Sequence, residues 1–262
     1  MAKASIGTYV YCVIAAPRPP RPPRLARVSA RLPGAGRVRL LDLGRGLYLA
    51  AADVPLARYG EAAIERGLSD LEWVSRTAVA HEAVVESFVG ASAVLPMKLL
   101  TIFNNDERAI EHVRADRSRI DALVKRVANH DEWGVRVMLD RARAVKAAAP
   151  PRRRSPRTSG LAYLSRKKAQ HDASIELAEH AREAVATVYD RLAAHARVAR
   201  RRLPSELPAQ GGPLLLDAAF LVPRTRLKRF RAAAVREARA MSRHGYDLTL
   251  TGPWPPYTFV QD

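Results

Sequence analysis

The chain has 262 residues, of which 48% are hydrophobic and 27% charged, and this composition excludes a disordered tail or a collagen-like fibre. Lysine and arginine number 44 against 26 aspartates and glutamates, a net charge of +18 that makes a polyanion a candidate partner. The cations are 37 arginines and only 7 lysines. So strong a preference for arginine in an alanine-rich chain indicates a coding bias more than a surface selected for charge.

The chain start admits two interpretations. Lys3 precedes the apolar stretch Tyr9–Ala16, as in a signal peptide, but the β-branched and aromatic run Thr8–Ile14 favours a β-strand. The lone cysteine, Cys12, cannot form an internal disulfide and fits a reducing compartment. No apolar run approaches the roughly 18–20 residues that a membrane helix needs. We therefore expect a cytoplasmic protein.

The first half alternates between strand and helix patterns. A proline/arginine spacer at 17–24 follows the first strand and reads as an extended surface loop or as a polyproline ligand for a partner. The pattern then predicts a hairpin turning at Gly44–Gly46, and Ser69 or Asp70 as the cap of a longer helix. The elements in order are strands Val38–Leu43 and Leu47–Ala52, helices Arg58–Arg66 and Asp70–Val89, strand Ala93–Phe103, and a helix from Asn104 to about Asn129.

The second half reads β–α–β–α–β, which favours an open sheet with helices on one face. A break at 147–160 is rich in proline and arginine. The elements are strand Trp133–Leu139, a helix from Leu161 to about Arg202, strand Leu214–Val222, basic helix Arg224–Arg243 and strand Tyr246–Thr251. We place the boundary near residue 130, giving an α/β (α+β) protein with an N-terminal α+β domain, 1–129, and a C-terminal domain, 130–262.

Catalytic and metal-binding patterns are missing from the sequence. His81-Glu82 resembles the start of a zinc-protease helix, but Val85 occupies the position of the second histidine. The seven histidines lack ligand spacing, and neither a glycine-rich phosphate loop nor a nucleophile elbow occurs. Two carboxylate pairs stand where they would cap helix or strand ends: Asp106–Glu107 and Asp131–Glu132. We therefore expect no enzyme activity, cofactor or metal.

Three basic clusters keep a nucleic-acid-binding protein open as an alternative. Arg152–Arg154, Arg200–Arg202 and Arg224–Arg231 carry charges that could contact phosphates. They occur without a helix-turn-helix or zinc-finger signature and without an aromatic stacking strip. Along 176–200 the arginines alternate with carboxylates, which is typical of a solvated helix face. A nucleic-acid-binding protein would show an affinity that falls steeply with salt.

Several segments along the chain form a distinctive ordered set of motifs. The most distinctive is the terminal Leu250–Val260, with its sequence Gly-Pro-Trp-Pro-Pro-Tyr. The others are Tyr9–Tyr11, His81–Glu86, Val94–Phe103, Glu132–Val137, Gly160–Leu164 with Arg166-Lys167, and Asp217–Val222. This set resembles, in order, motifs of the gas vesicle GvpL/GvpF proteins. It covers residues 9 to 260, so the resemblance extends over nearly the whole chain.

The sequence departs from the family pattern at two places. Cys12 stands where the family usually has glycine, and Lys98-Leu99-Leu100 stands where it has Arg-Phe-Gly. Lys98 keeps the charge of that arginine but lacks its forked donors, so a contact with a carboxylate would be weaker here. The proline/arginine spacer and the break at 147–160 are local elaborations.

The resemblance implies a two-domain fold with a ferredoxin-like second domain. It also implies a non-enzymatic accessory or minor structural protein of gas vesicle assembly. Such a protein would bind the hydrophobic shell protein GvpA, chiefly through its first domain, together with other accessory proteins or a second copy of itself. The motif residues that become candidates for interaction are His81, Glu82, Pro96, Lys98, Phe103, Glu132, Trp133, Tyr163, Arg166, Trp254, Pro256 and Tyr257.

A shell subunit must stay soluble until it is incorporated, so a partner has to cover apolar or strand-edge surface. The run Val94–Phe103 offers such an edge, and the aromatic arm of Trp254, Tyr257 and Phe259 offers a second contact. The competing interpretation of the arm is that it packs back on its own domain, because dense aromatics rarely stay exposed. For Glu132 and Trp133, packing between the domains competes in the same way with a ligand contact.

Overall fold

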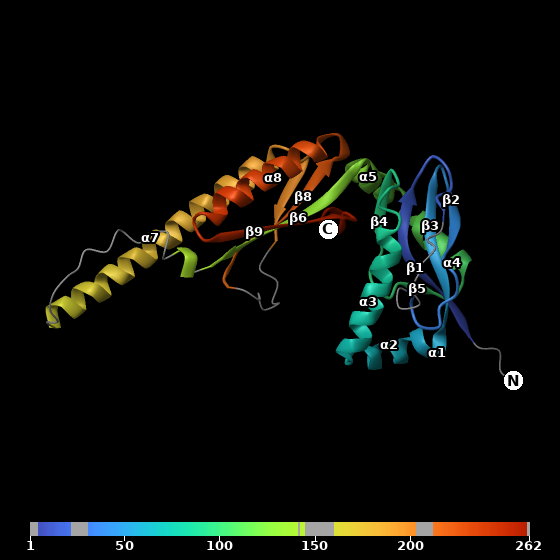
Figure 1. Cartoon of the computed structure of the whole chain (residues 1–262). Helices are drawn as coiled ribbons and strands as arrows, with labels where there is room; N and C mark the ends of the chain where they lie inside the picture. Colours follow the sequence, from blue (N-terminus) through green and yellow to red (C-terminus); the bar gives the residue numbers. More distant parts are fainter. Residues whose placement is uncertain (1–4, 22–30, 141, 145–159, 203–211, 261–262) are drawn as a thin grey trace. The chain divides into compact units, whose positions relative to one another are not determined.

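The computed structural model describes residues 5–21, 31–140, 142–144, 160–202 and 212–260 (Figure 1). The chain forms two compact units: unit 1 comprises Met1–Glu132 with Pro253–Asp262, and unit 2 comprises Trp133–Gly252. The division expected from the sequence lay near residue 130, with the whole C-terminus in the second half. The structure divides the chain between Glu132 and Trp133 and returns the C-terminal tail to unit 1.

The described part of unit 1 contains a sheet of five strands in the order β2-β3-β1-β4, with β5 also pairing with β1. These strands are β1 (Ile6–Ala15), β2 (Arg39–Gly44), β3 (Leu47–Pro55), β4 (Ala93–Pro96) and β5 (Ile102–Phe103). Strand β1 lies at the centre and is buried from Gly7 onward, as its unbroken apolar sequence predicts. The predicted hairpin is confirmed, since β2 and β3 pair across Gly44–Gly46, where all three residues have a positive φ.

The prediction of one continuous strand over Ala93–Phe103 is wrong. Strand β4 ends at Pro96, and β5 resumes at Ile102. Between them the Met97 amide donates to the carbonyl of Tyr11 at 2.9 Å, and the Thr101 amide donates to that of Lys98 at 3.2 Å. A turn thus interrupts the run, and both pieces still pair antiparallel with β1.

The helices of unit 1 are shorter than the sequence predicts. They are α1 (Leu56–Tyr59), α2 (Glu61–Leu68), α3 (Leu71–Glu86), α4 (Asp106–Ala115), α5 (Arg117–Val127) and α9 (Tyr257–Val260). Asp70 caps α3, as its carboxylate accepts from the amides of Glu72 and Trp73 at 2.9 and 3.1 Å. The predicted helix over 104–129 is two helices, because the backbone leaves helical geometry at Asp116.

The core of unit 1 lies between the sheet and α3. One face of β1 supplies Tyr9 and Tyr11, and α3 supplies Ala80, Val84 and Val85. These side chains are almost inaccessible to water, at 2% exposure or less. The residues that lie on one face of α3 therefore pack against the alternate residues that lie on one face of β1.

Unit 2 is built on a second sheet, in the order β7-β8-β6-β9. Its elements are β6 (His130–Leu139), α7 (Gly160–Ala193), β7 (Val198–Arg201), β8 (Leu214–Pro223), the 3-10 turn η2 (Arg224–Arg226), α8 (Leu227–Ser242) and β9 (Tyr246–Trp254). The predicted strands 133–139, 214–222 and 246–251 are each confirmed and slightly lengthened.

The prediction of one helix from Leu161 to Arg202 is wrong at its end. Helix α7 stops at Ala193, and Val198–Arg201 form a strand that pairs antiparallel with β8. Neither glycine nor proline marks this reversal, so the sequence carries no local stop signal. The partner strand decides the conformation of this segment, and the order of elements is β–α–β–β–α–β.

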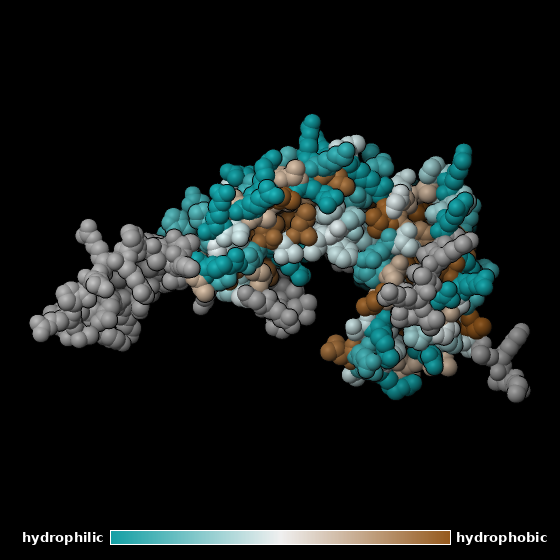
Figure 2. Space-filling model, viewed as in Figure 1, coloured by the Kyte–Doolittle hydropathy of each residue, from teal (hydrophilic) through white to brown (hydrophobic). Residues whose placement is uncertain are grey.

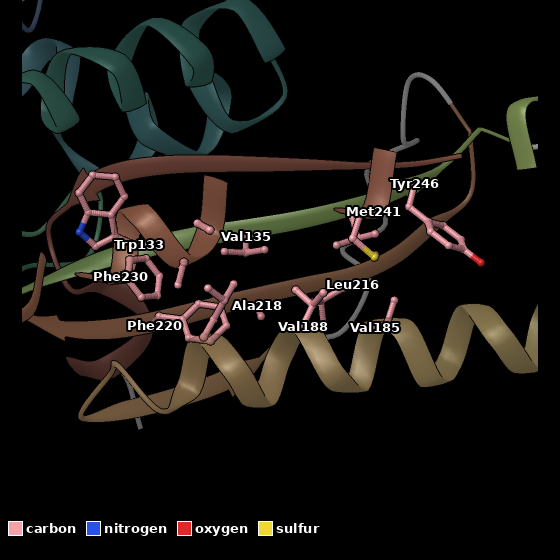
Figure 3. Close-up of a cluster of buried hydrophobic side chains, with 14 of the residues drawn as sticks. Trp133, Val135, Val185, Val188, Leu216, Ala218, Phe220, Phe230, Met241 and Tyr246 are labelled. Atoms are coloured by element: carbon pink, nitrogen blue, oxygen red, sulfur yellow. The ribbon is translucent and has the colours of Figure 1, made fainter. Parts of the chain in front are cut away.

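The core of unit 2 lies where α7 and α8 cover one face of this sheet (Figure 3). Val185 and Val188 of α7 point toward Leu216 and Phe220 of β8, and Phe230 of α8 joins them, with the rings of Phe220 and Phe230 5.6 Å apart. The expected apolar seam of α7 is buried at Ala181, Val185, Val188 and Leu192, whereas Ala178 is exposed and Ala199 lies in β7.

Within the described ranges, no helix is both long enough and apolar enough to cross a lipid bilayer.

Candidate functional site

Two of the family-like motifs meet at the buried hydroxyl of Tyr9 in unit 1. The Leu100 amide donates to this hydroxyl oxygen at 3.2 Å, and the hydroxyl lies 2.8 Å from Nδ1 of His81. Tyr9 and His81 share this hydrogen bond, and which of the two groups donates depends on the tautomer of the imidazole. Nε2 of His81 is buried as well, so His81 serves here as a fixed core residue.

The surroundings of His81 keep it neutral. Burial lowers the pKa of His81 to about 4, and the Met97 backbone opposes this shift to a smaller extent. Burial likewise raises the pKa of Tyr9 and Tyr11 above the ordinary tyrosine value. The rings of Tyr9 and Tyr11 lie 5.7 and 5.6 Å from that of His81, which makes a closed aromatic cluster. Among the described residues, no group of three or more potential ligands could hold a metal ion.

The C-terminal tail is anchored to unit 1 by Glu132. Thr258 donates to this carboxylate twice, from its amide at 2.9 Å and from its hydroxyl at 2.6 Å. Nη1 of Arg126 donates to the Phe259 carbonyl at 3.3 Å. Glu132 is 3% exposed, and Phe259 and Val260 are buried beside it. The tail is thus held by a buried, charge-assisted contact and by two apolar side chains.

The tail also approaches the His81-Glu82 motif. Burial raises the pKa of Glu82, its neighbour Glu86 raises it further, and the hydroxyl of Tyr257 lowers it. Burial is also the main cause that raises the pKa of Tyr257, whose side chain packs against the core of unit 1. Pro256 is buried, whereas Trp254 remains 37% exposed. The structure therefore brings His81, Glu82, Glu132, Pro256 and Tyr257 into one unit, although they span 177 positions of sequence.

The loop between β4 and β5 places the remaining candidates of unit 1. Pro96 pairs with Cys12 at the end of β4, and the ring of Phe103 lies 5.1 Å from that of His112. The Lys98 side chain is exposed and forms no ion pair with any carboxylate in the described ranges. Its carbonyl accepts from the Thr101 hydroxyl at 2.7 Å and so closes the turn. Lys98 contributes its backbone to the fold and leaves its charge in solvent.

Trp133 belongs to unit 2, unlike its neighbour Glu132. Its indole is 5% exposed, lies 6.3 Å from the Phe230 ring and is covered by the guanidinium of Arg231 at 5.9 Å. The side chains of Tyr163 and Arg166 lie outside the described residues, although their backbone is part of α7. Adjacent residues of one motif therefore serve two different cores.

Sequence reasoning missed an ionic cluster on the sheet of unit 2. Asp217 is 7% exposed and binds two arginines, Arg202 at 2.6 Å and Arg136 at 3.2 Å. Gly134 makes room for this cluster, since a Cβ there would lie 3.3 Å from Nη2 of Arg202 and 2.7 Å from Oγ1 of Thr251. The alternation along Gly134-Val135-Arg136 and around Asp217 could have predicted this cluster. It places Arg136 and Asp217 on the sheet face opposite the apolar core.

A second missed cluster ties α4 to the sheet of unit 1. Asp106 accepts from the hydroxyl of Thr8 at 2.7 Å and from Nη2 of Arg39 at 2.6 Å. Burial raises the pKa of this carboxyl, but the bonds from Arg39 and Thr8 outweigh it and hold the pKa below its ordinary value. Asn105, rather than Asp106, caps α4 by accepting from the amide of Arg108 at 2.9 Å.

The fold matches that of solved proteins. The structural match with the crystal structure of gas vesicle protein GvpF from Anabaena sp. PCC7120 covers 98% of this chain and 97% of that chain. Its TM-score is 0.65 at 17% sequence identity. GvpF from Microcystis aeruginosa gives a TM-score of 0.66 at 14% identity, with 98% and 99% of the two chains covered. The protein therefore belongs to the class with a mixed α+β fold and two sheets that these GvpF structures define.

The sequence comparisons identify the family. The family model described as gas vesicle synthesis protein GvpL/GvpF matches residues 7–261, and the chain belongs to this family. Gas vesicle protein L from Streptomyces sp. (strain CB03234) is 29% identical over 225 residues, which cover 85% of this chain and 82% of the relative. Gas vesicle protein F from the same strain is 29% identical over 210 residues, covering 73% and 80%. The resemblance found from the motifs is thus confirmed.

Proposed function

We propose that this protein is a non-enzymatic accessory or minor structural component of gas vesicle assembly that binds the hydrophobic shell protein GvpA. The observation that carries the proposal is the family match over residues 7–261. The buried, neutral His81 and the anchored tail also favour a structural role for the motif residues over a catalytic one. The protein would act in the cytoplasm, in contact with vesicles or their precursors.

We propose further that unit 1 supplies the surface for the shell protein. Support comes from the large apolar side chains of α2 and α3 that it leaves in solvent, Leu68 at 58%, Leu71 at 83% and Val79 at 60% exposure. Leu68 ends α2 and Leu71 begins α3, so two of them lie at one corner, where Figure 2 shows hydrophobic atoms on the surface. A shell protein with exposed apolar surface would cover such side chains.

For unit 2 we propose the ferredoxin-like arrangement. The order β–α–β–β–α–β and the strand order β7-β8-β6-β9 support this assignment. It leaves unit 2 as a scaffold with two helices on one sheet face.

Co-purification of the full chain with tagged GvpA, expressed together, tests the shell-protein proposal. The double variant Leu71→Glu/Val79→Glu should lose most of the recovered GvpA, because it places charge in the apolar contact. The matched control, Ile175→Glu/Val198→Glu, alters two exposed side chains of unit 2 and should recover GvpA like the unaltered chain. Loss in the control alone would move the contact to unit 2, and no recovery by the unaltered chain would refute the proposal.

A further inference from the structure

Helix α8 presents an outer face that the described fold leaves uncovered. Its inner face is fixed by the buried side chains of Phe230, Ala233, Ala234, Glu237 and Met241. At 100° per residue, the line opposite them runs through Lys228, Ala232, Val235, Arg239 and Ser242, all of which are exposed. We call this line the seam; Ala232 and Val235 are its apolar positions, and Lys228, Arg239 and Ser242 are its polar ones.

An arginine column flanks this seam. Arg229, Arg236 and Arg243 recur every seven residues, and each is exposed. They occupy the position beside the seam where interhelical charge pairs form in coiled coils. We call the seam and this column together the α8 ridge. Figure 2 shows hydrophilic side chains gathered over this helix.

The α8 ridge has no internal neutralisation. The one carboxylate of α8, Glu237, turns inward and binds Nη1 of Arg191 at 3.2 Å. Within the described part of the chain, no carboxylate forms an ion pair with any of the three arginines of the column. The first turn of α8 also lacks an acidic residue. These arginines, about 10 Å apart along the helix, give this face a positive potential that a partner's carboxylates would meet.

The ridge is not uniformly polar. Val235 is 49% exposed, and the small Ala232 lies one turn before it on the same line. A polyanion that contacts only charges would leave this apolar strip in water, whereas a helix with an apolar stripe would cover it. A second copy of α8 does not suit as the occupant, because its one carboxylate, Glu237, is buried and cannot pair with the arginine column.

We propose that the α8 ridge is a docking surface for an amphipathic helix of a partner protein whose apolar stripe is flanked by carboxylates. Ala232 and Val235 receive the apolar stripe, and Arg229, Arg236 and Arg243 pair with the flanking carboxylates. This inference does not rest on the proposed function. GvpA binding through unit 1 and helix binding through α8 can each fail while the other holds.

The test uses the full chain and a labelled synthetic peptide of three heptads, with Leu at positions a and d and Glu at e and g. Fluorescence anisotropy should detect binding of this peptide and at least tenfold weaker binding of a scrambled peptide of the same composition. The triple variant Arg229→Glu/Arg236→Glu/Arg243→Glu should weaken binding at least tenfold. The matched variant Arg66→Glu/Arg114→Glu/Arg182→Glu changes net charge equally at exposed sites and should bind like the unaltered chain.

Three results would overturn the proposal. The first is a scrambled peptide that binds as tightly as the ordered one, and the second is an equal loss of binding in both triple variants. Either result would show that binding depends on the net charge of the protein and not on the α8 ridge. A 20-base-pair DNA duplex that binds through the column, with no binding of the peptide, would make α8 a nucleic-acid contact. Should the triple variant not fold by circular dichroism, the single exposed change Val235→Asp, which should weaken peptide binding severalfold, decides in its place.

Discussion

At the scale of single residues, the departures from the family pattern have a definite structural context. Leu100 has a φ of 65°, in the left-handed region that glycine adopts freely and other residues adopt at a penalty of roughly 1 kcal/mol. The motif resemblance of this segment places glycine at this position. In this chain the side chain packs against the core of unit 1, and this burial offsets the backbone penalty.

Leu100→Gly should therefore be more stable than Leu100→Ala, by about 1 kcal/mol, because both lose the packing but only glycine loses the strain. Chemical denaturation of the two variants measures the difference. The neighbouring Leu99 has no positive φ, so Leu99→Gly should be less stable than Leu99→Ala. If Leu100→Gly were no more stable than Leu100→Ala, as expected at position 99, the backbone strain at Leu100 would be absent.

His81 gives stability a defined pH dependence. Its pKa is 6.5 in the unfolded chain and about 4 in the fold, so the unfolded state binds more protons between these values. The stabilisation from neutral His81 is complete above pH 6.5, is lost as the pH falls toward 4, and amounts to on the order of 3 kcal/mol. Denaturation curves from pH 4 to 7 should show this loss, and His81→Gln should flatten it.

The exposed His244 provides the control, because its side chain stays in water in both states. His244→Gln should leave the pH profile of unfolding unchanged. A profile for His81→Gln as steep as that of the unaltered protein would show that other groups carry the dependence.

At the scale of elements, the sequence predicted what local patterns determine. Strand β1, the Gly44–Gly46 hairpin and the Asp70 cap followed from β-branched runs, glycines and a capping residue. Strand β7 escaped prediction because Val198–Arg201 carry no turn signal and become a strand only by pairing with β8. The anchoring of Thr258 by Glu132 was equally hidden, since the two residues lie 126 positions apart.

The ionic cluster around Asp217 connects three strands, β6 through Arg136, β8 through Asp217, and the end of β7 through Arg202. Asp217→Ala should destabilise the protein by about 2 kcal/mol, because the carboxylate is buried while both arginines keep partial access to water. The matched change is Asp121→Ala, which breaks the exposed Arg117–Asp121 pair and should cost less than about 1 kcal/mol. Equal effects in urea denaturation would contradict a special role for Asp217.

At the scale of the whole molecule, the chain passes between its two units twice, after Glu132 and after Gly252. The net charge of +18 is divided unevenly, and α8 holds an unpaired share of it. For the aromatic tail the sequence left two interpretations, an interaction arm or packing on its own domain, and the tail packs on unit 1 with Phe259 at 1% exposure. The sequence could not assign the tail to either half. Its aromatic residues and prolines indicate that it packs, but they do not identify the domain that it packs against.

Removal of residues 255–262 should therefore weaken unit 1 and spare unit 2. It withdraws Phe259 and Val260 from the core and leaves the buried Glu132 carboxylate without Thr258, two losses of roughly 1–3 kcal/mol each. Hydrogen exchange should accelerate in β4 and α5, while β8 keeps its protection. A synthetic peptide of residues 253–262 added in trans should restore protection in unit 1. Trp254→Ala, which alters the exposed end of the same segment, should change exchange little, and acceleration confined to β8 would show that the tail serves unit 2 instead.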